Sequence, residues 1–197
     1  MSADQNASVD EIDQARAQEY ALLATLLAHH PDADMLRRLA RLGGDDSSLG
    51  AAHAALGAAA AAASAETVRR EYFDLFAGLG ERGLMPYASF YLAGSLYGRP
   101  LEKLREALRG LGIERVSQSE PEDHAAVVCE IMAGLIGGAF PAPAGGDRAF
   151  FKAHVASWIR SFFVDLEKSD ATSFYAHVGR LGRVFVDIET EAYAFAN

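Results

Sequence analysis

Acidic and histidine side chains are concentrated in the segment EPEDH, which spans residues 120–124 and precedes a strongly apolar stretch. Ser119 and Glu122 have the three-residue spacing of a capping box, and Pro121 suits a first helical turn because it has no N–H to satisfy. Carboxylates at that end also complement the positive pole of the helix dipole. Capping gives no reason for His124, so the segment is a candidate for binding as well as for a helix start.

A second candidate is the glycine pattern G-x-G-x-x-G at residues 78–83. A dinucleotide site needs a strand before this pattern and a helix directly after it, so that the pyrophosphate meets free N–H groups. Here a helical stripe ends at Phe76, and Met85 is followed by a proline. We therefore interpret the glycines as a helix stop and a loop.

The remaining reactive residues give no positive evidence for catalysis. No glutamate has a histidine three residues later, so the inward Glu-x-x-His pairs of a di-iron bundle are missing. The other histidines are scattered or lie at a helix end. Cys129 is the single cysteine and falls within an apolar stripe, which predicts a buried, inert thiol. We predict no metal, no cofactor and no enzyme activity.

The bulk composition narrows the class of protein. The chain has 197 residues, half of them apolar, and a formal net charge of −9. This size suits one domain, or one domain with a detachable part, and the charge argues against a nucleic-acid partner. The acidic N-terminus lacks the apolar run of a secretory signal, and the alanine tract at 58–63 is too short to span a membrane. We expect a cytoplasmic protein.

Apolar residues recur at helical spacing along the whole chain, without a convincing strand between them. Asp32 can cap a short helix after the first long one, and Ser47 or Ser48 can start an alanine-rich helix. We predict an all-α fold that forms a single globular multi-helix body.

The clearest linker is GGAFPAPAGGD at residues 137–147, which is rich in glycine, proline and alanine. We predict a hinge there, between an N-terminal helical part at 1–136 and C-terminal helices at 148–197 that pack on the same core.

Two aromatic clusters flank the glycine loop, YFDLF at 72–76 and PYASFY at 86–91. Composition favours a place in the core for both. The alternative is a binding rim, because tyrosine and proline give rigid contacts suited to peptide capture.

Three motifs taken together resemble the TorD/DmsD family of molybdoenzyme maturation chaperones, which includes the NarJ-type proteins. They are EYFDLFAG at 71–78, PYASFY at 86–91 with Gly98 downstream, and EPEDH at 120–124, in the family's order and spacing. The chain departs from the pattern by having tyrosine where some relatives have tryptophan in the proline-aromatic segment. Its C-terminal third carries no matching motif.

The resemblance implies a helical chaperone that binds the twin-arginine leader, or the N-terminal region, of an apo molybdopterin oxidoreductase. Such a chaperone holds back export and assembly until the cofactor is inserted. The resemblance also implies weak guanine nucleotide binding, and a monomer or a segment-exchanged homodimer. By the same resemblance, the leader would contact a surface made of Leu75, Phe76, Pro86, Tyr87, Ser89, Tyr91, Gly98, Glu120, Pro121, Asp123 and His124.

Two other functions remain open from the sequence. One is a helical adaptor of the same fold that serves a metalloenzyme without molybdenum. The other is an all-α enzyme whose site is built from scattered histidines and acids. A neighbouring gene for a molybdopterin oxidoreductase would favour the molybdoenzyme chaperone over both of these alternatives, and turnover of a small molecule would favour the enzyme.

Overall fold

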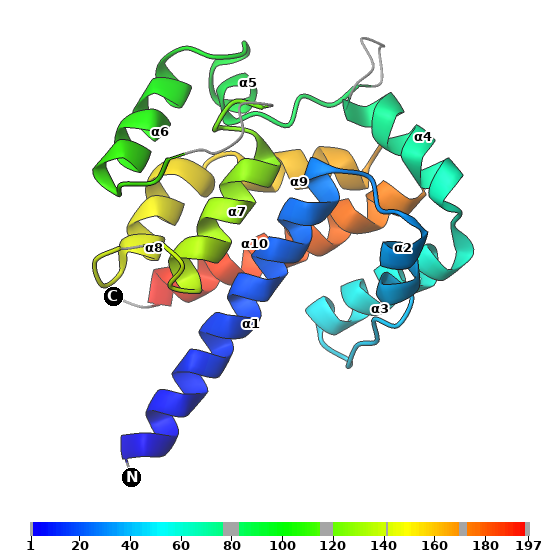
Figure 1. The fold of residues 1–197 in the computed structure, drawn as a ribbon, viewed down its shortest axis with the longest axis horizontal. Coiled ribbons are helices and arrows are strands. Elements are labelled where there is room, and N and C mark those ends of the chain that lie inside the picture. Colours follow the sequence, from blue (N-terminus) through cyan, green and yellow to red (C-terminus); the bar gives the residue numbers. More distant parts are fainter. Residues whose placement is uncertain (1, 77–82, 115–119, 141, 170–172, 196–197) are drawn as a thin grey trace. The chain divides into compact units, whose positions relative to one another are not determined.

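The computed structural model describes residues 2–76, 83–114, 120–140, 142–169 and 173–195 (Figure 1). Across these residues the regular structure is helical, and the only β pairing is an isolated bridge between Tyr87 and His124. The predicted all-α class is confirmed.

The helices form two compact units, each made of separate stretches of chain. The first unit comprises Met1–Ala28 and Tyr87–Ser157, and the second comprises His29–Pro86 and Trp158–Asn197. Both ends of the segment 137–147 therefore lie inside the first unit. The hinge predicted there stays a prediction.

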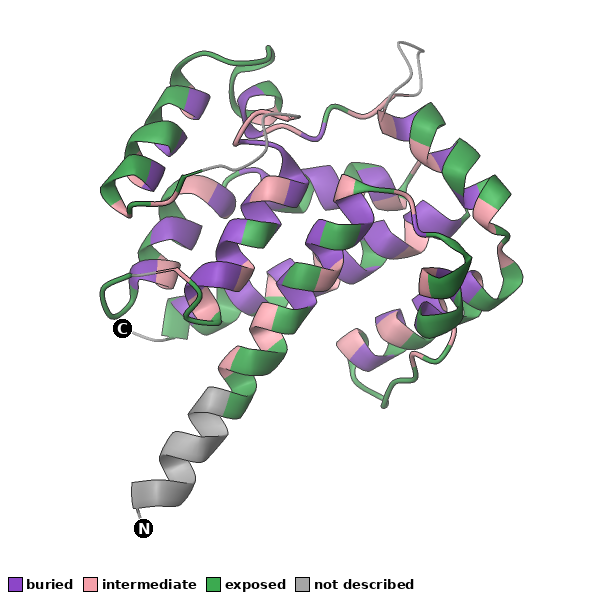
Figure 2. Ribbon diagram, in the orientation of Figure 1, coloured by how far each residue is buried: buried purple, intermediate pink, exposed green. Residues whose placement is uncertain are grey.

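The first unit is organised around two helices that lie side by side, α1 (Ser2–Ala28) and α7 (Ala125–Ile136) (Figure 1). It also contains α5 (Ala88–Ala93), α6 (Arg99–Gly110), α8 (Gly146–Phe150) and the π-helix η1 (Phe151–Val155). Figure 2 shows α7 as mostly buried. The core of this unit is built from apolar side chains at helical spacing, including Leu23, Leu27, Val128, Ile131 and Leu135.

The second unit is centred on its longest helix, α10 (Phe174–Phe195), which contacts α3 (Ser48–Ala62), α4 (Ala65–Phe76) and α9 (Ile159–Glu167). The short helix α2 (Ala33–Leu39) packs on α3. Glycines on α10 allow α9 to approach closely. A Cβ on Gly179 would lie 2.3 Å from the backbone nitrogen of Glu167, so no larger residue fits there without a shift.

Two of the predicted helix starts are confirmed. The Asp32 carboxylate accepts a hydrogen bond from the Met35 N–H, and the Ser47 hydroxyl accepts one from the Gly50 N–H. Each side chain satisfies an amide of the first turn, which otherwise has no partner within the helix.

The predicted capping box at Ser119 and Glu122 is wrong. Ser119 lies outside the described residues, and α7 begins only at Ala125, so Glu122 and Pro121 precede the helix. The N-cap is His124, whose Nδ1 accepts a hydrogen bond from the Ala126 N–H at 3.1 Å. The histidine that capping was expected to leave unexplained is itself the cap.

No single helix in the described part of the chain is long and apolar enough to cross a membrane. Together, α3 and α4 reach the required length and composition, but they are bent by 115° where they meet.

Candidate functional site

Asp123 and His124 join the starts of two helices in the first unit. The Asp123 carboxylate accepts a hydrogen bond from the Ser89 N–H at 2.8 Å, and its backbone carbonyl accepts one from the Ala88 N–H at 2.9 Å. Both amides belong to the first turn of α5, while the next residue, His124, caps α7. Two consecutive residues therefore fix where α5 and α7 begin.

Asp123 combines deep burial with an incomplete set of hydrogen bonds. The residue is 1% exposed, and its Oδ1 has no hydrogen-bond partner among the described residues. A buried carboxylate oxygen without a partner is costly, and such groups are concentrated at functional sites. Asp123 thus has a structural role through Oδ2, and its Oδ1 can accept a further hydrogen bond.

Tyr87 lies against the same segment. Its hydroxyl donates a hydrogen bond to Glu120 Oε2 at 2.7 Å, and its ring meets the His124 ring edge-on at 5.1 Å between centroids. Burial, followed by the hydrogen bond to Glu120, raises the pKa of the Tyr87 hydroxyl above its ordinary value. The hydroxyl is therefore a donor at neutral pH, and Glu120 is held as an acceptor.

Beside this polar group, an exposed apolar segment follows Ser89. It contains Phe90, Leu92, Leu96 and Tyr97, each between 38% and 58% exposed. In Figure 2 the connection between α5 and α6 is coloured as exposed. Four large apolar side chains within eight residues are unusual on a protein surface and mark it as a candidate contact surface.

The backbone of this segment is held in a defined shape. Gly94 ends α5 in the left-handed region, and Tyr97 also has a positive φ of 69°, which is rare for a residue with a side chain. The Tyr97 N–H donates a hydrogen bond to the Ser89 Oγ at 3.1 Å. Ser89 therefore links the exposed segment to Asp123.

The other residues expected at the site have different environments. In the first unit, Tyr91 and Pro121 are half-buried and Gly98 is exposed, with a φ of 74° just before α6. Leu75, Phe76 and Pro86 belong to the second unit. There Leu75 and Pro86 are buried, while the half-buried Phe76 ring contacts the rings of Tyr72 and Tyr175.

The preference for a core location of both aromatic clusters is wrong for one member of each. Phe73 is 45% exposed and Phe90 is 40% exposed. Of the residues at 90–97, Tyr91 was expected at the site, whereas the exposed Phe90, Leu92, Leu96 and Tyr97 were not among the residues that the resemblance implied. Gly94 and Gly98 could have indicated these residues from the sequence, because glycines at such spacing often mark the two ends of an ordered loop.

The glutamate of the motif at 71–78, Glu71, has a structural role. The Glu71 carboxylate accepts hydrogen bonds from the backbone N–H groups of Ser173 and Phe174, at 3.2 and 3.0 Å, and from the Ser173 hydroxyl at 3.0 Å. It also accepts a longer hydrogen bond from the Tyr175 N–H, at 3.4 Å. A side chain on α4 thus caps the start of α10.

Reactive groups elsewhere do not form a further site in the described part of the chain. Cys129 is buried, and burial raises the pKa of its thiol to about 12, as expected for an inert cysteine. No cluster of three or more His, Cys, Asp or Glu side chains suited to a metal ion occurs within the described ranges. Most of the glycine pattern at 78–83 lies outside them.

The amino-acid sequence matches a family of known proteins. The sequence profile of the nitrate reductase delta subunit family matches residues 43–164. Chaperone protein TorD from Vibrio vulnificus (strain CMCP6) is 28% identical over 132 residues, which cover 61% of this chain and 61% of that protein. TorD from Shewanella pealeana is 25% identical, over 93% of this chain and 91% of that protein. The chain thus spans about three-fifths of the Vibrio protein and most of the Shewanella protein.

A solved structure shares the fold. The crystal structure of a redox enzyme maturation protein from Archaeoglobus fulgidus matches with a TM-score of 0.59 and 21% identity, over 87% of this chain and 93% of that one. The sequence matches confirm the resemblance to the TorD/DmsD and NarJ-type proteins. Because the matching profile covers well over half of its residues, the chain belongs to the nitrate reductase delta subunit family.

Proposed function

We propose that this protein is a maturation chaperone that binds the twin-arginine leader, or the N-terminal region, of an apo molybdopterin oxidoreductase and delays its export until the cofactor is inserted. The observation that carries the proposal is the pairing of two features within the first unit. The acidic segment 120–124 is hydrogen-bonded to the start of α5, and the exposed apolar residues at 90–97 follow directly.

The two features suit the two parts of a leader peptide. Arginine side chains form short, charge-assisted hydrogen bonds with carboxylates, and Glu120 is a half-buried carboxylate already oriented by Tyr87. The apolar stretch of a leader can cover Phe90, Leu92 and Leu96, which are otherwise in contact with water. Asp123 and His124 set the spacing of the two features by capping α5 and α7.

Calorimetric titration of the full chain with a synthetic twin-arginine leader tests the proposal. Glu120→Gln keeps an acceptor for Tyr87 but removes the charge, and Leu92→Ser removes apolar area at an exposed position. Loss of a charge-assisted hydrogen bond corresponds to about 1.5–3 kcal/mol, so we expect Glu120→Gln to weaken binding about ten- to a hundredfold.

Matched controls are available on α10 in the second unit, where Ile188 is 42% exposed against 46% for Leu92. Ile188→Ser and Glu191→Gln should leave the affinity unchanged, and all four variants should unfold at nearly the same temperature. Equal binding by Glu120→Gln, Leu92→Ser and the controls would remove this surface from the mechanism. Purification of the native protein with an oxidoreductase would then identify the client independently.

A further inference from the structure

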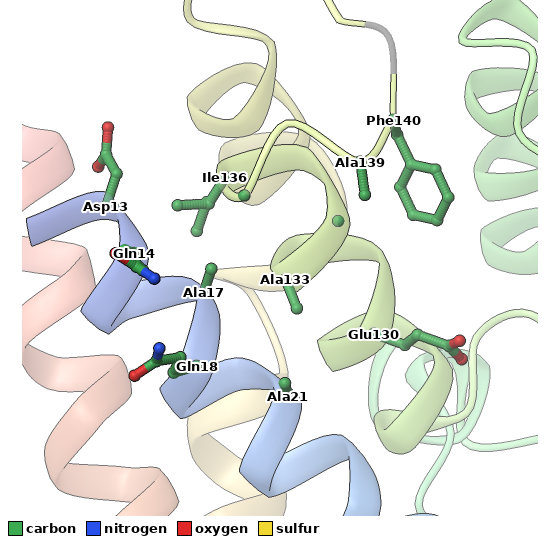
Figure 3. A pocket seen from close by; sticks show the side chains of 12 residues that line it. Asp13, Gln14, Ala17, Gln18, Ala21, Glu130, Ala133, Ile136, Ala139 and Phe140 are labelled. Atoms are coloured by element: carbon green, nitrogen blue, oxygen red, sulfur yellow. The ribbon is translucent and has the colours of Figure 1, made fainter. Parts of the chain in front are cut away.

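The first unit also contains a hollow whose lining includes none of the candidate site residues. It is a groove with a volume of about 730 Å³ between α1 and the C-terminal half of α7, continued by the turn that follows α7 (Figure 3). On the α1 side the groove runs from Asp13 to Ala21. At 1.5 Å per residue this is about 12 Å, a little over two helical turns.

The floor of the groove consists of small residues. Ala17 and Ala21 are one helical turn apart on α1, and Ala133 and Gly137 are one turn apart on and just after α7. A Cβ on Gly137 would lie 3.4 Å from the Ala17 Cβ, so the residue that ends α7 lies close to α1. Gln14, Gln18 and Ile136 also line the groove, so a third backbone can approach closely over the small residues between them.

One wall of the groove is fixed by an aromatic ring. Figure 3 shows the Phe140 side chain at the end of the turn after α7. A Cβ on Gly134 would lie 2.3 Å from this ring, so the ring rests directly on the helix backbone. The Ala139 and Phe140 N–H groups both donate hydrogen bonds to the Gly134 carbonyl, at 2.9 and 3.1 Å. The wall is thus preformed.

The charges around the groove have one dominant sign. Two carboxylates line the groove, Asp13 from α1 and Glu130 from α7, and Arg16 lies beside Asp13 on α1. Arg16 is shared, with an ion pair to Asp13 at 2.7 Å and a second carboxylate, Asp147, at 3.8 Å. Glu130 is exposed on the opposite rim and forms no ion pair with the described residues. The lining residues include no lysine or arginine.

From this geometry we infer that the α1/α7 groove docks a basic amphipathic helix of a partner protein. The helix lays a face of small and apolar residues on the alanine floor, against Phe140, and its lysines or arginines reach Glu130 and Asp13. Helices dock in grooves through residues at i, i+3, i+4 and i+7, and two turns of α1 accommodate one such set. The negative rim supplies the sign of charge that selects the partner.

The test uses the full chain and a designed probe. The probe is a synthetic helical peptide of about 16 residues with alanine and leucine on one face and lysine on the other, long enough to form a helix on binding. A peptide with glutamate in place of lysine is the control for charge. Binding is measured by calorimetry, and its place is mapped by changes in the NMR signals of the alanine methyl groups.

We expect the lysine peptide to bind, to shift the signals of Ala17, Ala21 and Ala133, and to bind more weakly at high salt. Glu130→Lys should weaken it about tenfold, because an attractive charge becomes a repulsive one. Ala21→Leu should weaken it similarly by filling the groove. Both positions are exposed and leucine is a good helix former, so both variants should fold.

The control variants are Glu191→Lys and Ala192→Leu, which make the same changes at exposed positions of α10. They should leave the affinity unchanged. The inference fails if the lysine peptide does not bind, if the glutamate peptide binds equally well, or if Ala21→Leu has no effect. Leader binding measured on the same groove variants should be normal, so this inference and the proposed leader site can fail separately.

Discussion

His124 is the last residue of the segment 120–124 and the N-cap of α7. Its Nδ1 accepts the Ala126 N–H, and a neutral imidazole has one accepting and one donating nitrogen, so the proton lies on Nε2. A protonated imidazole has no accepting nitrogen, so the ring can make this cap only in its neutral form. Any role in binding falls to the Nε2 side of the ring.

Substitution of His124 separates the cap from other roles. His124→Ala removes the side-chain acceptor at the start of α7 and should lower the free energy of unfolding by about 1 kcal/mol, the usual effect of a lost N-cap. His124→Asn supplies a strong N-cap residue and should recover most of this loss. Urea unfolding of the three proteins measures the difference. Equal stability of the alanine and asparagine variants would show that the cap contributes nothing.

At the scale of the helix, α10 depends on a residue far from it in sequence. Glu71 caps its first turn and lies 103 positions before Phe174. Glu71→Ala leaves amides of that turn without their acceptor in a buried place and should destabilise the protein by about 2–3 kcal/mol. Glu71→Gln keeps one oxygen acceptor and should lose less. Thermal and urea unfolding measure the stability of both variants. An alanine variant as stable as the glutamine variant would contradict the prediction.

An ion pair between α9 and α10 gives stability a pH dependence. The hydrogen bond from Arg183 lowers the pKa of Glu167 below its ordinary value of 4.5. A carboxyl whose pKa is lowered by folding stabilises the protein above the unfolded pKa, and this contribution disappears as the pH falls through the folded value. We expect a loss of less than about 1 kcal/mol below pH 4.5, because the pair is partly exposed.

The matched measurement is urea unfolding of Arg183→Gln and the unaltered protein between pH 3 and pH 7. The difference in free energy between the two proteins should be largest at neutral pH and should shrink in acid. A difference in free energy that stays constant over the whole pH range would mean that protonation of Glu167 does not break this ion pair.

The helices themselves could be predicted from the sequence, whereas two of the long-range caps could not. Periodic apolar residues indicated every long helix, and Asp32 and Ser47 were recognisable because each caps a helix a few residues away. Asp123 serves a helix that starts more than thirty positions earlier, and Glu71 serves one about a hundred positions later. Such pairs depend on the packing of the chain, which no local spacing records.

For the whole molecule, the segment 137–147 remains the predicted hinge. Residues 142–145 are exposed, and among the described residues there is no helix between Ile136 and Gly146. Elastase cuts beside small residues in exposed, irregular backbone, so limited proteolysis should cleave first at the alanines of this segment. Mass spectrometry of the fragments identifies the site. Early cleavage at another exposed loop, with this segment intact, would argue against the hinge.

The division of each unit between separate stretches has a consequence for protein synthesis. The first unit needs residues 1–28 together with 87–157, so α1 leaves the ribosome long before its partner α7 has been translated. Folding of the second unit can be completed only later, because its central helix α10 is translated last. An apolar face of α1 is therefore exposed on the nascent chain through much of translation, and a premature stop codon before α10 leaves the second unit without the helix on which it packs.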